Sequence, residues 1–417
     1  MATSPLKKLI QKCHDAAPIV ALLDTTLKNT ILEAMARGLE SHSAAILKEN
    51  AKDIKAAIAQ KMKPAFIDRL TLNEKRIAEM AQGLRDVAAL PDPVGKVTSS
   101  WTRPNGLEVT RVRIPLGVLG VIFESRPNVT VDAAGLCFKS GNAVVLRGGS
   151  EAIHSNKFLG KILQEVLQKN KIPAEAITII PTTDRRAMVE MLSFSNLIDL
   201  IIPRGGEGLM KFVETHSKIP VVKHDKGVCT LFVDESADLD MAVNIVRNAK
   251  VSRPGVCNAL ENVAVHEKVA PLFLSRLNEV LGRDRVELRG DAKARALIPA
   301  MKKASEKDWE TEYLDLILSC KVVANLDEAI EFIRRYGSHH TEAIVTRNQQ
   351  NADKFIRSLD SSCVLVNAST RFNDGGQLGL GAEIGISTTK IHAYGPMGLE
   401  ELTTTKFVVH GNGQVRS

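Results

Sequence analysis

One cysteine, Cys257, occupies a position suited to nucleophilic chemistry. It lies in the segment 253–258, Arg-Pro-Gly-Val-Cys-Asn, between a predicted helix and a predicted strand, where a rigid turn can expose its thiol. The nearby cations Lys250 and Arg253 favour the thiolate, which is the reactive form of a cysteine. Spacing alone supports a nucleophilic role and an inert structural role about equally.

The other five cysteines lie in apolar, periodic surroundings, and we interpret each as a small buried hydrophobic residue. They are Cys13, Cys137, Cys229, Cys320 and Cys363. No Cys-x-x-Cys pair is present, so the sequence predicts neither a metal site nor a disulfide framework. We expect a cytoplasmic protein, because the N-terminal apolar stretch is broken by charges and Pro18 and no apolar run reaches membrane-spanning length.

Two glycine-containing segments are candidates for binding a nicotinamide cofactor, although the usual G-x-G-x-x-G motif is missing after the first predicted strand of the sheet. The segment 147–150, Arg-Gly-Gly-Ser, ends a predicted strand, where parallel sheets bind ligands. The segment 204–208, Arg-Gly-Gly-Glu-Gly, joins a strand to a helix, where backbone N–H groups can face a pyrophosphate. Either segment alone is also explained as a plain turn, and their presence on one sheet favours the cofactor hypothesis.

The residue that follows the predicted strand 143–146 indicates which cofactor such a site would take. A carboxylate at this place usually binds the ribose 2′-hydroxyl of NAD, whereas an arginine accommodates the 2′-phosphate of NADP. The strand is followed by Arg147 and by no Asp or Glu. We therefore expect NADPH rather than NADH.

The elements that must position these residues follow an alternating pattern. A chain of 417 residues is too long for one simple core, so two or three lobes are expected. Residues 6–90 read as helices and 107–114 as a half-exposed strand. Strands then alternate with helices through 118–202, beginning with a strand at 118–123. After a junction at 234–238 the alternation resumes through 239–367, where a strand at 314–324 precedes a helix at 326–336. This pattern predicts an α/β fold with two largely parallel sheets, and a strand at 404–409 with too little sequence left to form its own sheet.

Composition weighs against nucleic acid as a partner. The net charge is +7, but the 55 Lys and Arg residues are spread along the chain among 48 acidic residues. A nucleic-acid surface needs a basic patch or stripe, and single-stranded nucleic acid is bound on aromatic faces, which are scarce here at 4%. We expect no nucleic-acid and no membrane partner, and favour an anionic small substrate or simple solubility.

Several segments resemble one enzyme family along the whole chain. They are 114–130 (IPLGVLGVIFESRPNVT), 139–143 (KSGNA), the Cys257 loop, 366–372 (VNASTRF), 379–387 (GLGAEIGIS) and 395–398 (GPMG). These segments closely resemble the gamma-glutamyl phosphate reductases, also called glutamate-5-semialdehyde dehydrogenases, of the aldehyde dehydrogenase superfamily. The resemblance implies a homo-oligomer with a cofactor domain, a catalytic domain and a small β oligomerisation element. Their expected bounds are 1–106 and 115–234, 235–395, and 107–114 and 396–417, respectively.

The resemblance also assigns roles to individual residues. It makes Cys257 the catalytic thiol and leads us to expect an NADP-dependent, phosphorylating semialdehyde dehydrogenase. The cofactor-binding residues that it implies are Arg147, Gly148 and Ser150 for the adenosine ribose, Gly205 and Gly206 for the pyrophosphate, and Glu312 for the nicotinamide ribose. The candidate substrate-binding residues are Arg126, Asn128, Arg253, Asn258 and Arg371. No metal is expected.

One departure from the superfamily indicates the direction of the reaction. Oxidising aldehyde dehydrogenases carry a glutamate that activates water to hydrolyse the acyl-enzyme, and the aligned position here is His224. Histidine can still act as a base, so the loss is not absolute. An enzyme that reduces its thioester gains from lacking an activated water, and the departure therefore favours reduction of an acyl phosphate.

The expected reaction is the NADPH-dependent reduction of L-glutamyl 5-phosphate to L-glutamate 5-semialdehyde and phosphate through a Cys257 thioester. It is the second step of proline biosynthesis from glutamate, and functional coupling to glutamate 5-kinase is a further expectation. The oxyanion would be held by backbone N–H groups near Cys257 and a side chain of segment 125–128. The alternatives are an NAD(P)-dependent aldehyde oxidiser and a non-catalytic basic α/β binding protein.

Overall fold

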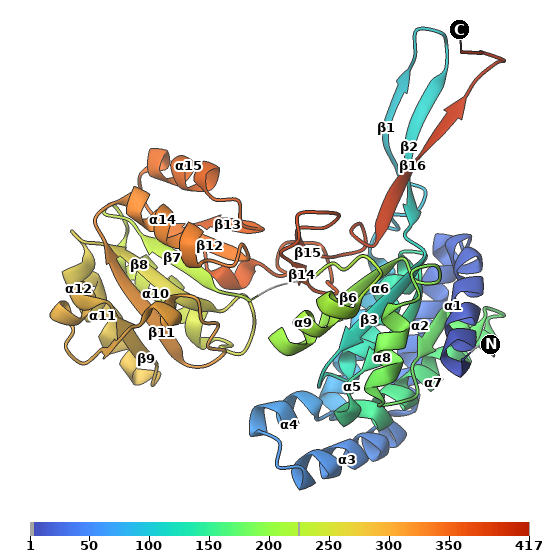
Figure 1. The fold of residues 1–417 in the computed structure, drawn as a ribbon, viewed down its shortest axis with the longest axis horizontal. Helices are drawn as coiled ribbons and strands as arrows, with labels where there is room; N and C mark the ends of the chain where they lie inside the picture. Colours follow the sequence, from blue (N-terminus) through green and yellow to red (C-terminus); the bar gives the residue numbers. More distant parts are fainter. Residues whose placement is uncertain (1–3, 224–225, 417) are drawn as a thin grey trace. The chain divides into compact units, whose positions relative to one another are not determined.

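The computed structural model describes residues 4–223 and 226–416, which form two compact units (Figure 1). Unit 1 comprises residues 4–223, Leu380–Gly385 and residues 397–416. Unit 2 comprises residues 226–379 and Ile386–Pro396. The predicted α/β class with two parallel sheets is confirmed, and each unit contains one of the sheets.

The first part of unit 1 is helical, as predicted. Three of its helices begin at residues whose side chains accept a hydrogen bond from a first-turn backbone N–H, namely Ser4, Asp24 and Asn73. The helices are α1 (Pro5–Ala21), α2 (Thr25–Ser41), α3 (Ser43–Ala59), α4 (Pro64–Leu70) and α5 (Glu74–Ala89).

A four-stranded parallel sheet forms the centre of unit 1, in the order β5-β4-β3-β6. Its strands are β3 (Val118–Phe123), β4 (Ala143–Gly148), β5 (Ile177–Ile179) and β6 (Leu200–Arg204). Its helices are α6 (Asn128–Lys139), α7 (Ile153–Lys169), α8 (Arg185–Leu192) and α9 (Glu207–His216). One apolar cluster joins α1, α8 and α9 to the sheet, while α6 and α7 cover its other face with α5 and α2 packed behind them.

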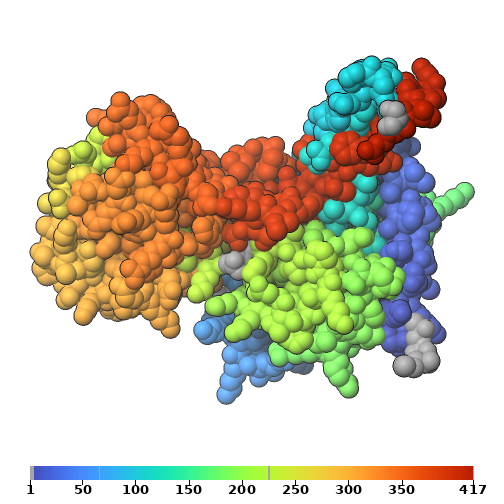
Figure 2. Space-filling view, turned by 45° about the horizontal axis from the view of Figure 1, so that its top comes forward, coloured from blue at the N-terminus to red at the C-terminus, as the bar shows by residue number. Residues whose placement is uncertain are grey.

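A three-stranded antiparallel sheet projects from the rest of unit 1 (Figures 1 and 2). It consists of β1 (Val97–Thr102), β2 (Glu108–Pro115) and β16 (Thr403–His410), with β2 in the middle. The expected bounds of the oligomerisation element, 107–114 and 396–417, omit β1, which the sequence analysis left in the cofactor domain. Every residue of β1 is exposed, so the strand carries no alternating apolar pattern that could have marked it.

Unit 2 is built on a seven-stranded parallel sheet in the order β10-β9-β11-β8-β7-β12-β13. Its strands are β7 (Cys229–Val233), β8 (Leu260–His266), β9 (Glu287–Gly290), β10 (Lys302–Lys303), β11 (Ile317–Val323), β12 (Thr341–Val345) and β13 (Cys363–Val366). Its helices are α10 (Leu239–Val251), α11 (Ala270–Arg283), α12 (Ala292–Leu297), α13 (Glu306–Trp309), α14 (Leu326–Tyr336) and α15 (Gln349–Ser358). Two apolar clusters, one with α10 to α12 and one with α13 to α15, cover the sheet.

Three boundaries differ from the expected ones. Strand β7 falls within the range 115–234 assigned to the cofactor domain, but it pairs with β8 and β12 and therefore belongs to unit 2. The segment Leu380–Gly385, expected in the catalytic domain, groups with unit 1, where the backbone at Gly381 packs against Leu90. The strand expected from residue 314 begins at Ile317, because Leu314 has a φ of 54° and cannot lie in an extended strand.

Candidate functional site

Cys257 lies at the amino end of β8, on the loop that follows α10. A hydrogen bond fixes its backbone: the Cys229 thiol donates to the Cys257 carbonyl oxygen at 3.2 Å. The backbone of Gly227 is so close that a Cβ there would lie 2.0 Å from the same oxygen. The Cys257 side chain remains partly exposed. The structure therefore combines a firmly held backbone with an accessible thiol.

Four of the other five cysteines differ from Cys257 in burial. Cys13, Cys137, Cys229 and Cys320 are buried, which confirms the interpretation made for them, and burial raises the pKa of each thiol, that of Cys13 to about 12. Cys363 is only half-buried, but burial raises its pKa as well. These thiols are poor nucleophiles because they resist ionisation.

Of the two cations that spacing placed near Cys257, only Lys250 is excluded, and a third residue, which the spacing argument did not use, adds positive charge. Lys250 is completely buried, and its Nζ lies 2.6 Å from Glu261 Oε2, so it is not an exposed cation beside the thiol. The half-buried guanidinium of Arg371 interacts electrostatically with Cys257 and Arg253 instead. Burial and the charge of Arg253 lower the pKa of Arg371, while Asp374 and Cys257 act in the opposite direction.

A cavity of about 320 Å³ opens beside this group of residues. It is lined by Asn248, Ser252, Arg371, Phe372, Asp374 and Gln377. The lining therefore combines one cation, one anion and several neutral polar groups. Such a surface suits a small substrate that carries charges of both signs.

Asn258 connects the Cys257 loop to the segment that carries Arg371. Its Nδ2 donates to the Asn373 carbonyl oxygen at 2.9 Å, and its own carbonyl accepts from Thr370 Oγ1 at 2.7 Å. Its side chain is only 3% exposed. These contacts favour a role for Asn258 in holding Arg371 near the thiol over direct contact with substrate.

The candidate substrate residues Arg126 and Asn128 belong to unit 1, in the loop between β3 and α6 and at the start of α6. Ser125 next to them has a φ of 47°, and Glu151 holds it by accepting its N–H at 2.5 Å and its Oγ–H at 2.8 Å. Asn128 Nδ2 donates to Asp132 Oδ2 at 2.8 Å, and burial raises the pKa of Asp132 to about 6. A strained residue fixed by a specific contact is typical of functional loops.

Five of the six cofactor candidates gather at the carboxyl ends of β4 and β6. Arg147 and Gly148 are the last two residues of β4, and Ser150 opens the 3₁₀ turn after it. Arg147 is 8% exposed, and its Nε has no hydrogen-bond partner in the described part of the chain. Burial lowers the pKa of Arg147, and Arg185, which the sequence analysis did not single out, adds a second positive charge nearby.

Side chains of the protein lie close to two glycines at the same edge of the sheet. A Cβ at Gly148 would lie 1.9 Å from Asn156 Nδ2, and one at Gly205 would lie 2.4 Å from Glu124 Oε2. The Gly206 N–H, which precedes α9, donates to Glu124 at 3.0 Å. The partnerless arginine nitrogen and the glycine backbone at this edge fit a phosphate-bearing nucleotide, and this ligand would displace Glu124 to reach the Gly206 N–H.

Glu312 lies half-buried in the turn before β11, in unit 2. The next two residues are anchored, Tyr313 through its hydroxyl and Leu314 through its N–H. His224, the residue at the position of the hydrolytic glutamate, lies outside the described residues. Sequence reasoning alone had no signal for Arg185 or Asp374, because neither belongs to a recognisable motif.

Comparison with known proteins identifies the family. The model of the aldehyde dehydrogenase family matches residues 2–315. The chain belongs to the aldehyde dehydrogenase family. It is 58% identical over 411 residues to a gamma-glutamyl phosphate reductase from Geobacter metallireducens, with 99% of this chain and 98% of that protein covered. A gamma-glutamyl phosphate reductase from Xanthomonas oryzae is 52% identical, with 99% of both chains covered.

Solved structures agree with this assignment. The crystal structure of a gamma-glutamyl phosphate reductase from Thermotoga maritima has a TM-score of 0.97 at 47% identity, with 99% of this chain and all of that chain covered. These relatives place the chain among the gamma-glutamyl phosphate reductases, so it is an oxidoreductase. An acetylating aldehyde dehydrogenase from Geobacillus thermoglucosidasius shares the fold, with a TM-score of 0.71 at 16% identity and 99% and 97% of the two chains covered. Within residues 4–223 and 226–416, no helix has the length and apolar character needed to cross a lipid bilayer.

Proposed function

We propose that the protein reduces L-glutamyl 5-phosphate to L-glutamate 5-semialdehyde and phosphate with NADPH, the second step of proline biosynthesis from glutamate. The observation that carries the proposal is the partly exposed Cys257, whose thiol interacts electrostatically with the guanidinium of Arg371. A guanidinium favours both the thiolate and an anionic acyl phosphate. The names of the relatives support the same substrate.

In the proposed reaction the Cys257 thiolate attacks the acyl carbon, forming an S–C bond while the C–O bond to phosphate breaks. Phosphate leaves as an anion, so no strong general acid is needed. Backbone N–H groups of the Cys257 loop would stabilise the oxyanion, because their positions are set by the contacts with Gly227 and Cys229. Ser125 and Asn128 remain candidates for a side-chain donor.

The cavity beside Arg371 supports binding of the amino-acid part of the substrate. Arg371 and Arg253 would bind the phosphate and the α-carboxylate. Asp374, on the same cavity, would bind the α-ammonium group. Because the cavity is lined by the cation Arg371 and the anion Asp374, it would distinguish glutamyl phosphate from an acyl phosphate that lacks an amino-acid head group.

The residues that would hold NADPH are Arg147 and Arg185 at the 2′-phosphate and Gly205 and Gly206 at the pyrophosphate. Glu312 would contact the nicotinamide ribose. When bound, the cofactor supplies the hydride that converts the thioester to the aldehyde. The projecting sheet is the proposed oligomerisation element: Phe407 on it is 62% exposed and contacts Trp101 edge to face.

Replacing Cys257 with alanine tests the proposal in the reverse direction, by phosphate-dependent reduction of NADP with the semialdehyde. The change should lower kcat at least about 10⁴-fold, because covalent catalysis is lost. Cys363→Ala removes the other half-buried thiol and is the matched control, with activity expected near that of the wild type. Near-wild-type activity of the Cys257→Ala protein would refute the mechanism. Turnover that does not depend on phosphate would indicate an aldehyde oxidiser instead.

A further inference from the structure

A buried ion pair flanks the Cys257 loop and has no part in the proposed chemistry. Lys250 is in the last turn of α10, before the loop, and Glu261 is the second residue of β8, after it. Both side chains are completely buried, and Lys250 Nζ lies 2.6 Å from Glu261 Oε2. The pair therefore connects the helix before the loop to the strand after it.

The second oxygen of Glu261 holds a different segment. Glu261 Oε1 accepts the backbone N–H of Leu314 at 3.3 Å. Leu314 has a φ of 54°, a conformation that a leucine adopts only when its surroundings impose it. The turn held in this way carries Glu312. Burial is the main cause of the raised pKa of Glu261, and the charge of Glu312 adds to it.

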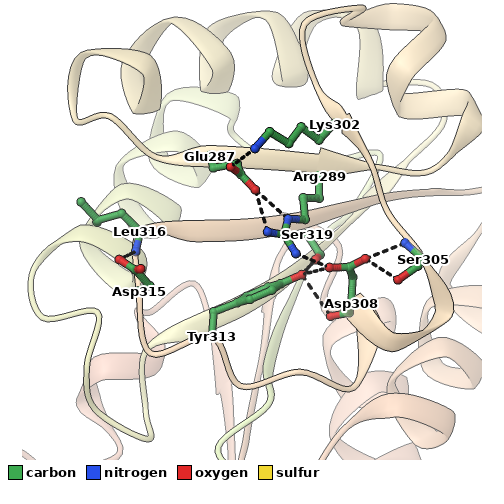
Figure 3. Close-up of polar contacts among 9 residues, drawn as sticks. All are labelled: Glu287, Arg289, Lys302, Ser305, Asp308, Tyr313, Asp315, Leu316 and Ser319. Atoms are coloured by element: carbon green, nitrogen blue, oxygen red, sulfur yellow. Dashed lines mark hydrogen bonds and ion pairs between the residues drawn. The ribbon is translucent and has the colours of Figure 1, made fainter. Parts of the chain in front are cut away.

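The side chain between these two residues, Tyr313, is anchored as well (Figure 3). Its hydroxyl bonds to Asp308 Oδ1 and to Ser319 Oγ, at 2.8 Å each. Two cations lie over its ring, with Lys250 Nζ 5.9 Å and the Arg289 guanidinium 5.1 Å from the ring centre. Lys250 therefore contacts both Glu261 and the ring of Tyr313.

Stability alone does not explain the Lys250–Glu261 pair. Burial raises the pKa of Glu261 to about 8 and lowers that of Lys250, so each charge depends on the other. Apolar residues of similar volume often stabilise a protein as well as or better than a buried ion pair. The carboxylate of Glu261 instead orients its neighbours. One oxygen binds Lys250 and the other binds the Leu314 N–H, so two separate segments are held at defined angles.

We propose that Glu261 is a positioning residue that sets the Cys257 loop through Lys250 and the Glu312 turn through Leu314. In this way it couples the geometry of the reacting thiol to that of the nicotinamide-ribose contact. The roles of Cys257 and Glu312 in this statement rest on the proposed function. The contacts of Glu261 do not depend on it.

Three variants separate the two connections. Lys250→Met removes the connection to the loop but leaves Glu261 to bind Leu314. It should slow iodoacetamide labelling of Cys257 at pH 7 about tenfold, because the loop no longer holds the thiol in place near Arg371. The NADPH dissociation constant should change less than about twofold. The double variant Lys250→Met/Glu261→Leu should show the slow labelling and also bind NADPH at least about tenfold more weakly. Glu261→Gln keeps an oxygen for the Leu314 N–H and should restore NADPH binding.

The readouts are mass spectrometry of the labelled cysteine and fluorescence titration with NADPH, and neither requires turnover. Arg247→Met is the matched control, because Arg247 is on the same helix, one turn earlier, and pairs with Asp284 at the surface. It should change neither readout. The double variant replaces the pair with apolar side chains and is expected to fold, which circular dichroism checks.

Wild-type labelling and NADPH binding in the folded double variant would overturn the proposal. Equal effects of Lys250→Met on both readouts would also overturn it, because the two connections would then not be separate. A wild-type protein that binds NADPH and labels at Cys257 but does not use glutamyl phosphate would refute the proposed substrate. That outcome would leave the positioning role of Glu261 intact.

Discussion

Asp308 anchors the Glu312 turn through one partly buried charge, and Asp308→Asn tests how much the turn depends on it. Asp308 Oδ2 accepts the N–H and the Oγ–H of Ser305 at 2.7 and 2.6 Å. Its Oδ1 accepts from Arg289 at 2.6 Å and from the Tyr313 hydroxyl at 2.8 Å (Figure 3). An asparagine keeps one acceptor but turns an NH₂ group toward donors. Since a hydrogen bond to a charged group contributes roughly 1.5–3 kcal/mol, we expect unit 2 to lose about 3 kcal/mol at pH 7.

The loss should depend on pH in a defined direction. Burial alone would raise the pKa of Asp308, but the hydrogen bonds from Ser305, Arg289 and Tyr313 outweigh it and hold the pKa well below the ordinary value. A carboxylate with a lowered folded-state pKa stabilises the protein above its unfolded-state pKa of about 3.9, and this stabilisation is lost as the pH falls toward the folded-state value. The difference between wild type and variant should therefore be full at pH 7 and shrink below about pH 4.

Hydrogen exchange of the β11 amides at several pH values measures this difference within unit 2. NADPH binding should weaken in parallel, because the turn that carries Glu312 loses its anchor. Asp360→Asn is the control: Asp360 is 63% exposed, and its change should stay within about 0.5 kcal/mol. A difference that is equally large at pH 7 and pH 3, or one below about 0.5 kcal/mol, would refute the reasoning.

Two further predictions concern the cofactor and the nucleophile. Arg147→Ala should weaken NADPH binding by about tenfold or more and NADH binding far less, as measured by titration with each cofactor. The control Arg186→Ala removes a surface partner of Asp184 and should change neither affinity. Equal losses for both cofactors would show that Arg147 does not bind the 2′-phosphate. Gly227→Ala places a Cβ 2.0 Å from the Cys257 carbonyl oxygen and should lower kcat by roughly 100-fold. The control Gly282→Ala adds a Cβ that meets no other atom within 4 Å and should leave kcat unchanged. An active, stable Gly227→Ala protein would refute the prediction, because the Cys257 loop could then move without loss of activity.

Much of the fold could be predicted from local patterns. The helix 326–336 and the strand 118–123 were predicted with the bounds that the structure has, because apolar residues repeat at the period of each element. Strands without such a pattern were missed: β1 is exposed throughout, and β10 has only two residues. The spacing of apolar residues identifies a helix or a strand, but it does not identify the elements that pack against it.

The same division holds for the site. The residues around Cys257, together with the family resemblance, singled out that thiol from the sequence alone, since its loop differs from the apolar surroundings of the other cysteines. The partners of the thiol could not be read in the same way. The amino ends of β7, β8 and β12 meet beneath it, so Cys229 supports Cys257 from a strand far away in the sequence, and Arg371 provides the charge that spacing had assigned to Lys250.

The sequence by itself predicted most of the elements, the family and the candidate nucleophile, because these predictions depend on residue types at short spacing. Only the tertiary structure decided how charges are paired. Lys250 and Glu261 are eleven residues apart in sequence and read as two ordinary charged residues. Packing of α10 against β8 removes both from water, and a buried charge must then find a partner. This requirement pairs Lys250 with Glu261, so Lys250 is not an exposed cation beside the thiol.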